Sequence, residues 1–124
     1  MNILRAHDAQ RHTTPNATVI PLATPSLGAQ QISVIRQEMG PGHANPAHAQ
    51  THEEVMVMLD GQVTVTVDGG TTDLQAGDTL TIPAMTVHSI ENPGPQGATW
   101  LIVSPTGMGF LGADGQVMTP DWAK

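Results

Sequence analysis

The sequence predicts an all-β domain, a sandwich or barrel built from short strands, and three observations lead to this fold class. Residues 63–67 alternate valine with threonine, and residues 79–82 alternate threonine with leucine and isoleucine. This period of two is the pattern of a strand with one buried face. The chain also has 13 glycines and 10 prolines, which favour many short elements joined by turns. No window before the C-terminal tail shows a helical period.

The expected strands follow one another along the chain, with turn residues between them. Extended segments begin near Val19, and Gly40-Pro41-Gly42 closes the first clear strand. Asp68-Gly69-Gly70 supplies residues that tolerate positive φ, as a tight hairpin requires. Strands that recur at this short spacing are typical of sandwiches and barrels. The clear strands are expected at residues 32–39, 54–59, 63–67, 79–82, 87–91 and 98–103.

A chain of 124 residues has room for one domain with one core. Residues 1–16 are polar and aperiodic and are expected to form an N-terminal arm. Residues 17–104 hold the strand pattern of the barrel. Residues 105–124 carry large apolar side chains that a solvated tail seldom contains, among them Phe110 and Trp122. We therefore expect this C-terminal extension to pack on the barrel.

Composition excludes several classes of function. The formal net charge is −7, and Lys and Arg together number 4, so clustered basic residues for nucleic acid or an anionic membrane surface are missing. There is no cysteine, which excludes disulfides and thiolate metal sites. No apolar run approaches the roughly 20 residues of a membrane span, and the N-terminal residues lack the apolar core of a signal peptide. The expected location is the cytoplasm.

One segment combines several possible metal ligands at a spacing of two. In an extended chain His48, Gln50, His52 and Glu54 would all project from the same face. A later strand could bring His88 towards them across the barrel. A nitrogen and oxygen donor set without thiolate suits divalent Fe, Mn, Ni or Zn and disfavours a closed structural zinc site.

Two stretches of the sequence resemble the paired motifs of the cupin superfamily. Residues 42–61, GHANPAHAQTHEEVMVMLDG, resemble the first motif, G-x5-H-x-H-x3-E-x6-G. Residues 77–92, GDTLTIPAMTVHSIEN, resemble the second motif, G-x5-P-x-G-x2-H-x3-N. The resemblance implies a small single-domain cupin with a jelly-roll β-barrel. It also implies that His48, Glu54 and His88 are metal ligands.

The sequence departs from the two motifs at two positions. Met85 replaces a glycine, in a turn that often tolerates side chains. Gln50 replaces the second metal histidine, and an amide oxygen is a weaker donor than imidazole. Gln50 is therefore either a ligand or a residue that orients a metal-bound water. His52 could take the place of the missing histidine, but in cupins the chain usually bends before the glutamate, which would turn His52 aside to the rim of the pocket.

The strand that follows Glu54 is apolar on both faces. Met56 and Met58 share the face of Glu54, where they would line a substrate pocket, fill the core, or do both. The opposite face, which includes Val57, needs cover of its own. In small cupins a second subunit commonly supplies that cover, so the resemblance implies a homodimer.

The expected function is that of a metal-dependent enzyme acting on an uncharged small molecule that bears a carbonyl or enol group. By resemblance the enzyme would be a dioxygenase, which is an oxidoreductase, or else an isomerase, cyclase or lyase. Glu54 would ligate the metal or act as the catalytic base. The alternative is a small-molecule binding module without turnover, which the weakened ligand Gln50 favours. The short chain disfavours a storage or structural cupin.

Overall fold

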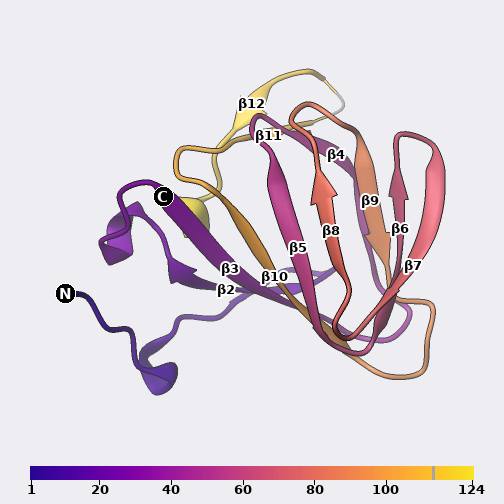
Figure 1. The fold of residues 1–124 in the computed structure, drawn as a ribbon, viewed down its shortest axis with the longest axis horizontal. Helices are drawn as coiled ribbons and strands as arrows, with labels where there is room; N and C mark the ends of the chain where they lie inside the picture. The colour runs from indigo at the N-terminus through magenta and orange to yellow at the C-terminus, as the bar shows by residue number, and fades with distance from the viewer. Residues whose placement is uncertain (113) are drawn as a thin grey trace.

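The computed structural model describes residues 1–112 and 114–124. Two antiparallel six-stranded sheets face one another and form a jelly-roll barrel (Figure 1). The strands are β1 (His12–Thr13), β2 (Thr18–Ala23), β3 (Ile32–Met39), β4 (Ala44–Gln50), β5 (Glu54–Asp60), β6 (Gln62–Val67), β7 (Gly70–Gln75), β8 (Thr79–Ile82), β9 (His88–Glu91), β10 (Ala98–Pro105), β11 (Phe110–Leu111) and β12 (Val117–Met118). Three short 3-10 helices complete the described chain, at η1 (Ala6–Asp8), η2 (Pro25–Leu27) and η3 (Asp121–Ala123).

The strand order explains how residues far apart in sequence meet. The first sheet has the order β1-β2-β3-β10-β5-β8, and the second has the order β12-β11-β4-β9-β6-β7. The strand that starts with Glu54 therefore belongs to one sheet, and the strands that carry His48 and His88 belong to the other. None of the helices in the described chain is long and apolar enough to cross a membrane.

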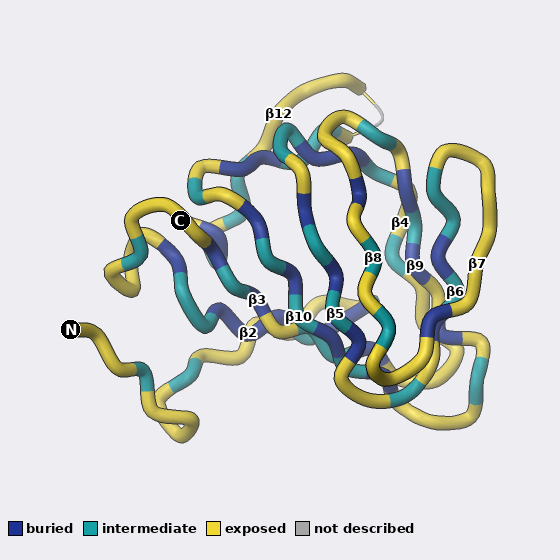
Figure 2. The backbone as a smooth tube through the Cα atoms, in the orientation of Figure 1, coloured by how far each residue is buried: buried dark blue, intermediate teal, exposed yellow. Residues whose placement is uncertain are grey.

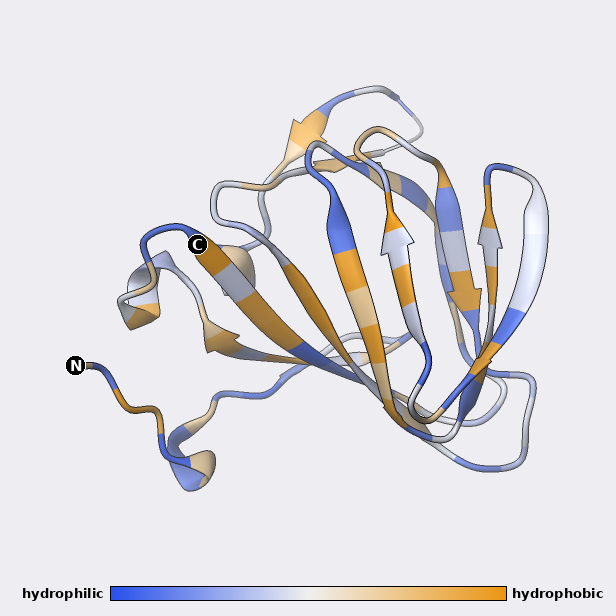
Figure 3. Cartoon of the chain, viewed as in Figure 1, coloured by the Kyte–Doolittle hydropathy of each residue, from blue (hydrophilic) through white to orange (hydrophobic). Residues whose placement is uncertain are grey.

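Alternation of side chains decides which residues face the interior. Along β5 and β10 buried and half-buried residues take turns, which Figure 2 shows as alternating bands. Val63 and Val65 of β6 are fully buried, as their alternation with threonine predicts. The core between the sheets includes Trp100, which is 0% exposed. Figure 3 shows the apolar bands on β3, β10 and β5.

The hairpin between β6 and β7 forms at the predicted turn. Asp68 has a φ of 50° and Gly69 a φ of 83°, the left-handed values that a two-residue hairpin loop requires. The strand that follows, β7, was not among the clear strands expected from the sequence. Leu74 is its one buried residue, because β7 lies at the edge of its sheet and its other side chains are exposed. A strand at an exposed edge carries little apolar alternation and is hard to detect from sequence.

The C-terminal segment covers one end of the barrel. β11 pairs with β4, so that Phe110 lies opposite Gln50, and β12 extends the sheet beyond it. Trp122 packs against the core cluster. At the other end of the chain, β1 pairs with β2 and adds to the edge of the first sheet.

Candidate metal centre

The strands bring four of the expected site residues to one end of the barrel. His48 on β4 and His88 on β9 are direct partners in the antiparallel register. Gln50 ends β4, and Glu54 begins β5 in the facing sheet. This is the end at which β11 pairs with β4, at the top of the view in Figure 1. The resemblance to the two cupin motifs implied this meeting, and paired strands place their residues side by side.

Glu54 and His88 are in direct contact. Glu54 Oε1 lies 2.9 Å from His88 Nε2, and both side chains are 2% exposed. The ring centroids of His48 and His88 are 4.5 Å apart. Glu54, His88 and His48 therefore form a compact polar group inside an otherwise apolar barrel.

Each histidine is oriented by a backbone carbonyl. The Nδ1 atom of His48 lies 2.9 Å from Pro46 O, and the Nδ1 atom of His88 lies 3.0 Å from Thr86 O. A carbonyl only accepts, so Nδ1 is the donor in both rings and Nε2 is left for another partner. Carbonyl contacts of this kind commonly hold metal-binding histidines in the correct tautomer.

Two buried acceptors in this group have no hydrogen-bond partner. They are Gln50 Oε1 and the second carboxylate oxygen of Glu54, Oε2. Burying such an atom without a donor costs about 1–3 kcal/mol. A cation compensates buried oxygen acceptors that lack donors, and a divalent transition metal also accepts imidazole nitrogen. The chemistry of the donor set His48, Gln50, Glu54 and His88 therefore fits such a metal.

The electrostatic environment differs between the two histidines. Burial lowers the pKa of His48; the bond to Pro46 O and the charge of Glu54 oppose this effect, and His88 adds to it. Burial also pulls the pKa of His88 down, but the hydrogen bond to Glu54, the bond to Thr86 O and the charge of Glu54 outweigh it. The pKa of His88 therefore lies above its usual value. Both ring nitrogens of His88 lie at hydrogen-bond distance from an oxygen atom, Nδ1 from Thr86 O and Nε2 from Glu54 Oε1.

The donors are not gathered into a complete ligand set. Over residues 1–112 and 114–124, no three histidine, aspartate or glutamate side chains lie close enough together to hold a metal ion. The hydrogen bond between Glu54 and His88 engages Nε2, the nitrogen that a metal would need. Metal binding by these residues therefore requires this hydrogen bond to open and the Nε2 proton to leave.

His52 is turned away from the group, as the bend expected in cupins implies. The chain bends at Thr51 and His52, so β4 and β5 are not one continuous strand. His52 Nδ1 lies 2.8 Å from Thr51 Oγ1, and Thr51 Oγ1 also accepts a bond from Gly109 N. His52 thus belongs to the connection that fastens the C-terminal segment, and it remains half-buried at the rim.

Met56 and Met58 lie in the packed core. They are 0% and 1% exposed, and both belong to the core cluster. Met58 is paired with Trp100, and Met56 is paired with Ile102 on β10 and Leu80 on β8. Of the two readings that the sequence left open, core filling is the one these contacts support. Met56 is nevertheless the next inward residue after Glu54, so it forms the floor beneath the polar group.

Phe110 is a site residue that the sequence analysis did not name for the site. Its ring centroid lies 5.3 Å from that of His48 in an edge-on arrangement, and 5.6 Å from Trp122. Gly109 accepts a backbone bond from Thr51, which fixes Phe110 beside the bend. The apolar content of the tail indicated packing, but no sequence signal located it over His48.

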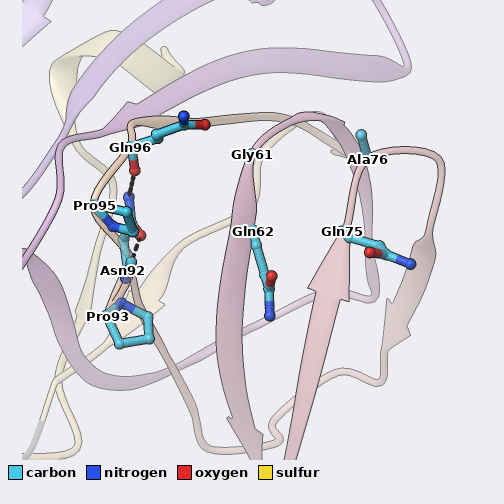
Figure 4. Close-up of a pocket in the computed structure, with 9 residues that line it drawn as sticks. Gly61, Gln62, Gln75, Ala76, Asn92, Pro93, Pro95 and Gln96 are labelled. Carbon is cyan, nitrogen blue, oxygen red and sulfur yellow. Dashed lines mark hydrogen bonds between the residues drawn. The ribbon is translucent and has the colours of Figure 1, made fainter.

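A surface cavity of about 490 Å³ lies at the opposite end of β5, shown in Figure 4. Gln62 and Gln75, register partners on β6 and β7, line it together with the loop that follows Asn92. Asn92 is 1% exposed and fixes this loop: it donates to Met39 O at 3.1 Å and Gln96 O at 2.7 Å. Asn92 therefore has a structural role at the end of the barrel away from the histidines.

Comparisons with known proteins agree with this architecture. A family model described as Cupin domain matches residues 35–104. A search of curated proteins finds no match to the sequence.

Several solved structures are similar. The polyketide cyclase RemF from Streptomyces resistomycificus is 20% identical with a TM-score of 0.76, covering 85% of this chain and 79% of that one. KdgF from Halomonas sp. is 17% identical with a TM-score of 0.70, covering 82% and 90%. An oxalate decarboxylase from Lactobacillus farciminis is 28% identical with a TM-score of 0.73 over 79% of this chain, and this chain spans 31% of that one.

The family match covers more than half of the chain and includes both motifs. The fold, with His48, Glu54 and His88 at one end of a jelly-roll barrel, agrees with it. The chain belongs to the cupin family.

Proposed function

We propose that the protein is a metal-dependent cupin enzyme acting on an uncharged small molecule that bears a carbonyl or enol group. The observation that carries the proposal is the pair of buried acceptors, Gln50 Oε1 and Glu54 Oε2, beside two histidines whose Nδ1 atoms are already bound to carbonyls. His48, Gln50, Glu54 and His88 would hold the metal. When bound, a divalent metal such as Fe, Mn, Ni or Zn supplies Lewis-acid polarisation or oxygen chemistry.

Glu54 is suited to move a proton within this site. Its Oε1 atom exchanges a hydrogen bond with His88 Nε2 at 2.9 Å, while its Oε2 atom has no partner. Where Glu54 keeps this bond instead of ligating the metal, Oε2 can accept a proton from a bound molecule while Oε1 holds the carboxylate in place. The catalytic role proposed for Glu54 is that of the general base.

The charges of the chain support an uncharged substrate. Arg11 and Arg36 both contact Glu38 on β3, and Lys124 contacts Asp121 at 3.2 Å. These contacts engage three of the four Lys and Arg side chains, and the fourth, Arg5, lies in the N-terminal arm. A phosphate or polyanionic sugar would find no such partner at the site among the residues described. Phe110 and Trp122 cover this end of the barrel and reduce its exposure to water, which strengthens polar interactions inside.

A binding module without turnover is the second candidate. The closed hydrogen bond between Glu54 and His88 favours it, because Glu54 Oε1 and His88 Nε2 satisfy one another without a metal. Gln50, a neutral donor in place of a histidine, points the same way. The similar structures carry names of different activities, so a shared fold does not choose between turnover and binding.

We also propose that the protein acts as a homodimer. On the outer face of the first sheet, Val55 and Val57 lie beside Val103 and Leu101 of β10 and are half-buried, and Leu59 is 44% exposed. A continuous apolar row of this kind on a sheet face is typical of a surface that another molecule covers. A second copy of the chain is the partner that the cupin family implies.

Metal analysis of protein purified without an affinity tag tests the central proposal. Wild-type protein is expected to hold close to one transition metal per chain, and the double variant His48→Ala, His88→Ala is expected to lose it while keeping its circular dichroism spectrum. A matched control is His43→Ala, which alters an exposed histidine in the loop before β4. Full metal content in the double variant would refute the assignment.

Turnover is tested on a panel of enols, diketones and polyphenols with Fe, Mn, Ni and Zn forms of the protein. Loss of substrate only under air identifies an oxygenase, and loss under nitrogen identifies an isomerase, cyclase or lyase. Binding without conversion across the panel favours the module.

A further inference from the structure

Two buried donors accompany the two buried acceptors of the site. Among the residues described, the buried side-chain atoms without a hydrogen-bond partner include Ser104 Oγ and Trp100 Nε1, both on β10. The two lie at different depths, because four residues of extended strand separate them by roughly 13 Å. Trp100 is paired with Met58 deep in the core, whereas Ser104 lies at the end that holds the histidines.

The register places Ser104 beside Glu54. Val103 pairs with Val55, so the next inward position on β10 lies next to the first residue of β5. Ser104 also pairs with Ser33 on β3. Ser33, Ser104 and Glu54 are 2%, 4% and 1% exposed, and they form one buried row across three adjacent strands.

A hydroxyl is an expensive side chain to bury at a position where the neighbouring inward residues are apolar. The inward residues that precede Ser104 on β10 are Trp100 and Ile102, and a valine would fill the same space without a polar atom. Ser104 Oγ can donate one hydrogen bond, and the neighbouring Glu54 Oε2 can only accept. Neighbouring cross-strand side chains have Cβ atoms roughly 4.5–5.5 Å apart, so the polar ends of Ser104 and Glu54 are within reach of one small group.

We propose that Ser104 and Glu54 together bind one hydroxyl group of the substrate. The hydroxyl accepts a hydrogen bond from Ser104 Oγ and donates a hydrogen bond to Glu54 Oε2. Both unpartnered atoms are then satisfied at once. This rests on the proposed function and narrows it: the site selects an enol, phenol or alcohol over a ketone or ether, which lacks the proton that Glu54 accepts.

The test compares phenol with anisole, its methyl ether, as matched probes of the metal-free protein, in which Glu54 Oε2 has no partner. Binding is followed by the backbone amide shifts of Ser104 and Glu54 in NMR titrations. Wild-type protein is expected to bind phenol more tightly than anisole. Ser104→Ala is expected to weaken phenol binding on the order of fivefold, the loss of one net hydrogen bond, and to leave anisole binding unchanged. Ser104→Thr keeps the hydroxyl and is expected to restore the preference.

Ser33→Ala is the matched control, because it removes a buried hydroxyl from the same row one strand farther from Glu54. It is expected to leave the ratio of phenol to anisole affinity unchanged. A purely structural Ser104 would lower the melting temperature in Ser104→Ala without changing that ratio, and this result would overturn the proposal. So would equal binding of the two probes by the wild type, or no shift with either probe. Metal content of the purified wild type separates the two proposals. If the wild type holds metal but Ser104→Ala leaves the ratio of phenol to anisole affinity unchanged, this inference alone is refuted. If the wild type holds no metal, the proposed function is refuted.

Discussion

Replacing Asn92 should reveal how strongly one buried amide holds the end of the barrel opposite the histidines. Its Nδ2 group donates to Met39 O at 3.1 Å and to Gln96 O at 2.7 Å, and its Oδ1 atom accepts from Gly94 N at 3.1 Å. Each hydrogen bond contributes about 1 kcal/mol net, so Asn92→Ala is expected to lower the free energy of unfolding by about 3 kcal/mol. For a chain of this length the melting temperature should fall by roughly 10–15 °C.

Asn92→Asp separates hydrogen bonding from packing, because the two side chains have nearly the same shape. At pH 7 a carboxylate would face the carbonyls of Met39 and Gln96, which can only accept, so this variant should be less stable than Asn92→Ala. Burial beside two carbonyl oxygens raises the folded-state pKa of the new carboxyl above its unfolded value of about 3.9. The penalty relative to wild type should therefore shrink as the pH falls through the folded-state pKa.

Urea unfolding followed by tryptophan fluorescence and circular dichroism provides the assay, from pH 4.5 to pH 8. Gln96→Ala is the control, because its side chain is exposed and its carbonyl, which Asn92 uses, is retained. A loss below about 1 kcal/mol for Asn92→Ala would refute the calculation. An aspartate variant that is more stable than the alanine variant at pH 7 would show that the amide is not bound as described.

Three further predictions concern other parts of the molecule. In metal-free protein, Glu54→Gln should lower the pKa of His88 in an NMR titration, because the hydrogen bond and the charge that oppose the effect of burial are weakened. The wild type, whose His88 pKa is raised, should lose stability relative to this variant as the pH rises above about 6.5. An unchanged His88 pKa would contradict the pairing of Glu54 with His88. Met85→Gly should stabilise the protein by up to about 1 kcal/mol, because Met85 is exposed and has a φ of 62°, which glycine adopts without strain. Met85→Ile should destabilise the protein. Thermal melts that reverse this order would contradict the positive φ at this turn. Val57→Asp should convert a homodimer to a monomer in light scattering, and a wild-type mass near 13.0 kDa would remove the basis for the dimer.

The strands illustrate which features were predictable from sequence. Residues 32–39 and 79–82 form strands with the expected limits, and β5, β6 and β9 differ from expectation by a residue at one end. Alternation is a local property that one strand displays by itself, so its buried face can be assigned before any partner is known. β7 was missed for the same reason, since an exposed edge strand needs no apolar face.

The candidate site also has features that were predictable from the sequence and features that were not. The resemblance to the cupin motifs implied that His48, Glu54 and His88 meet, and the register between β4 and β9 and the contact between Glu54 and His88 agree with it. The spacing-two pattern alone left His52 on the same face as Gln50. The bend at Thr51 and His52 decided between them, because a turn reverses the alternation that a continuous strand would keep.

The sequence by itself determined the fold class and the turns, because periodicity and glycine or proline positions act over a few residues. The resemblance to the cupin motifs implied that histidine and carboxylate share one site. Tertiary structure decided which atoms are paired and which are left without a partner. Glu54 uses one oxygen on His88 and keeps the other unpartnered, Ser104 lies beside it through the pairing of β10 with β5, and Phe110 covers His48 from the tail. Such contacts depend on strand register and on segments far apart in the chain, and no local pattern encodes them.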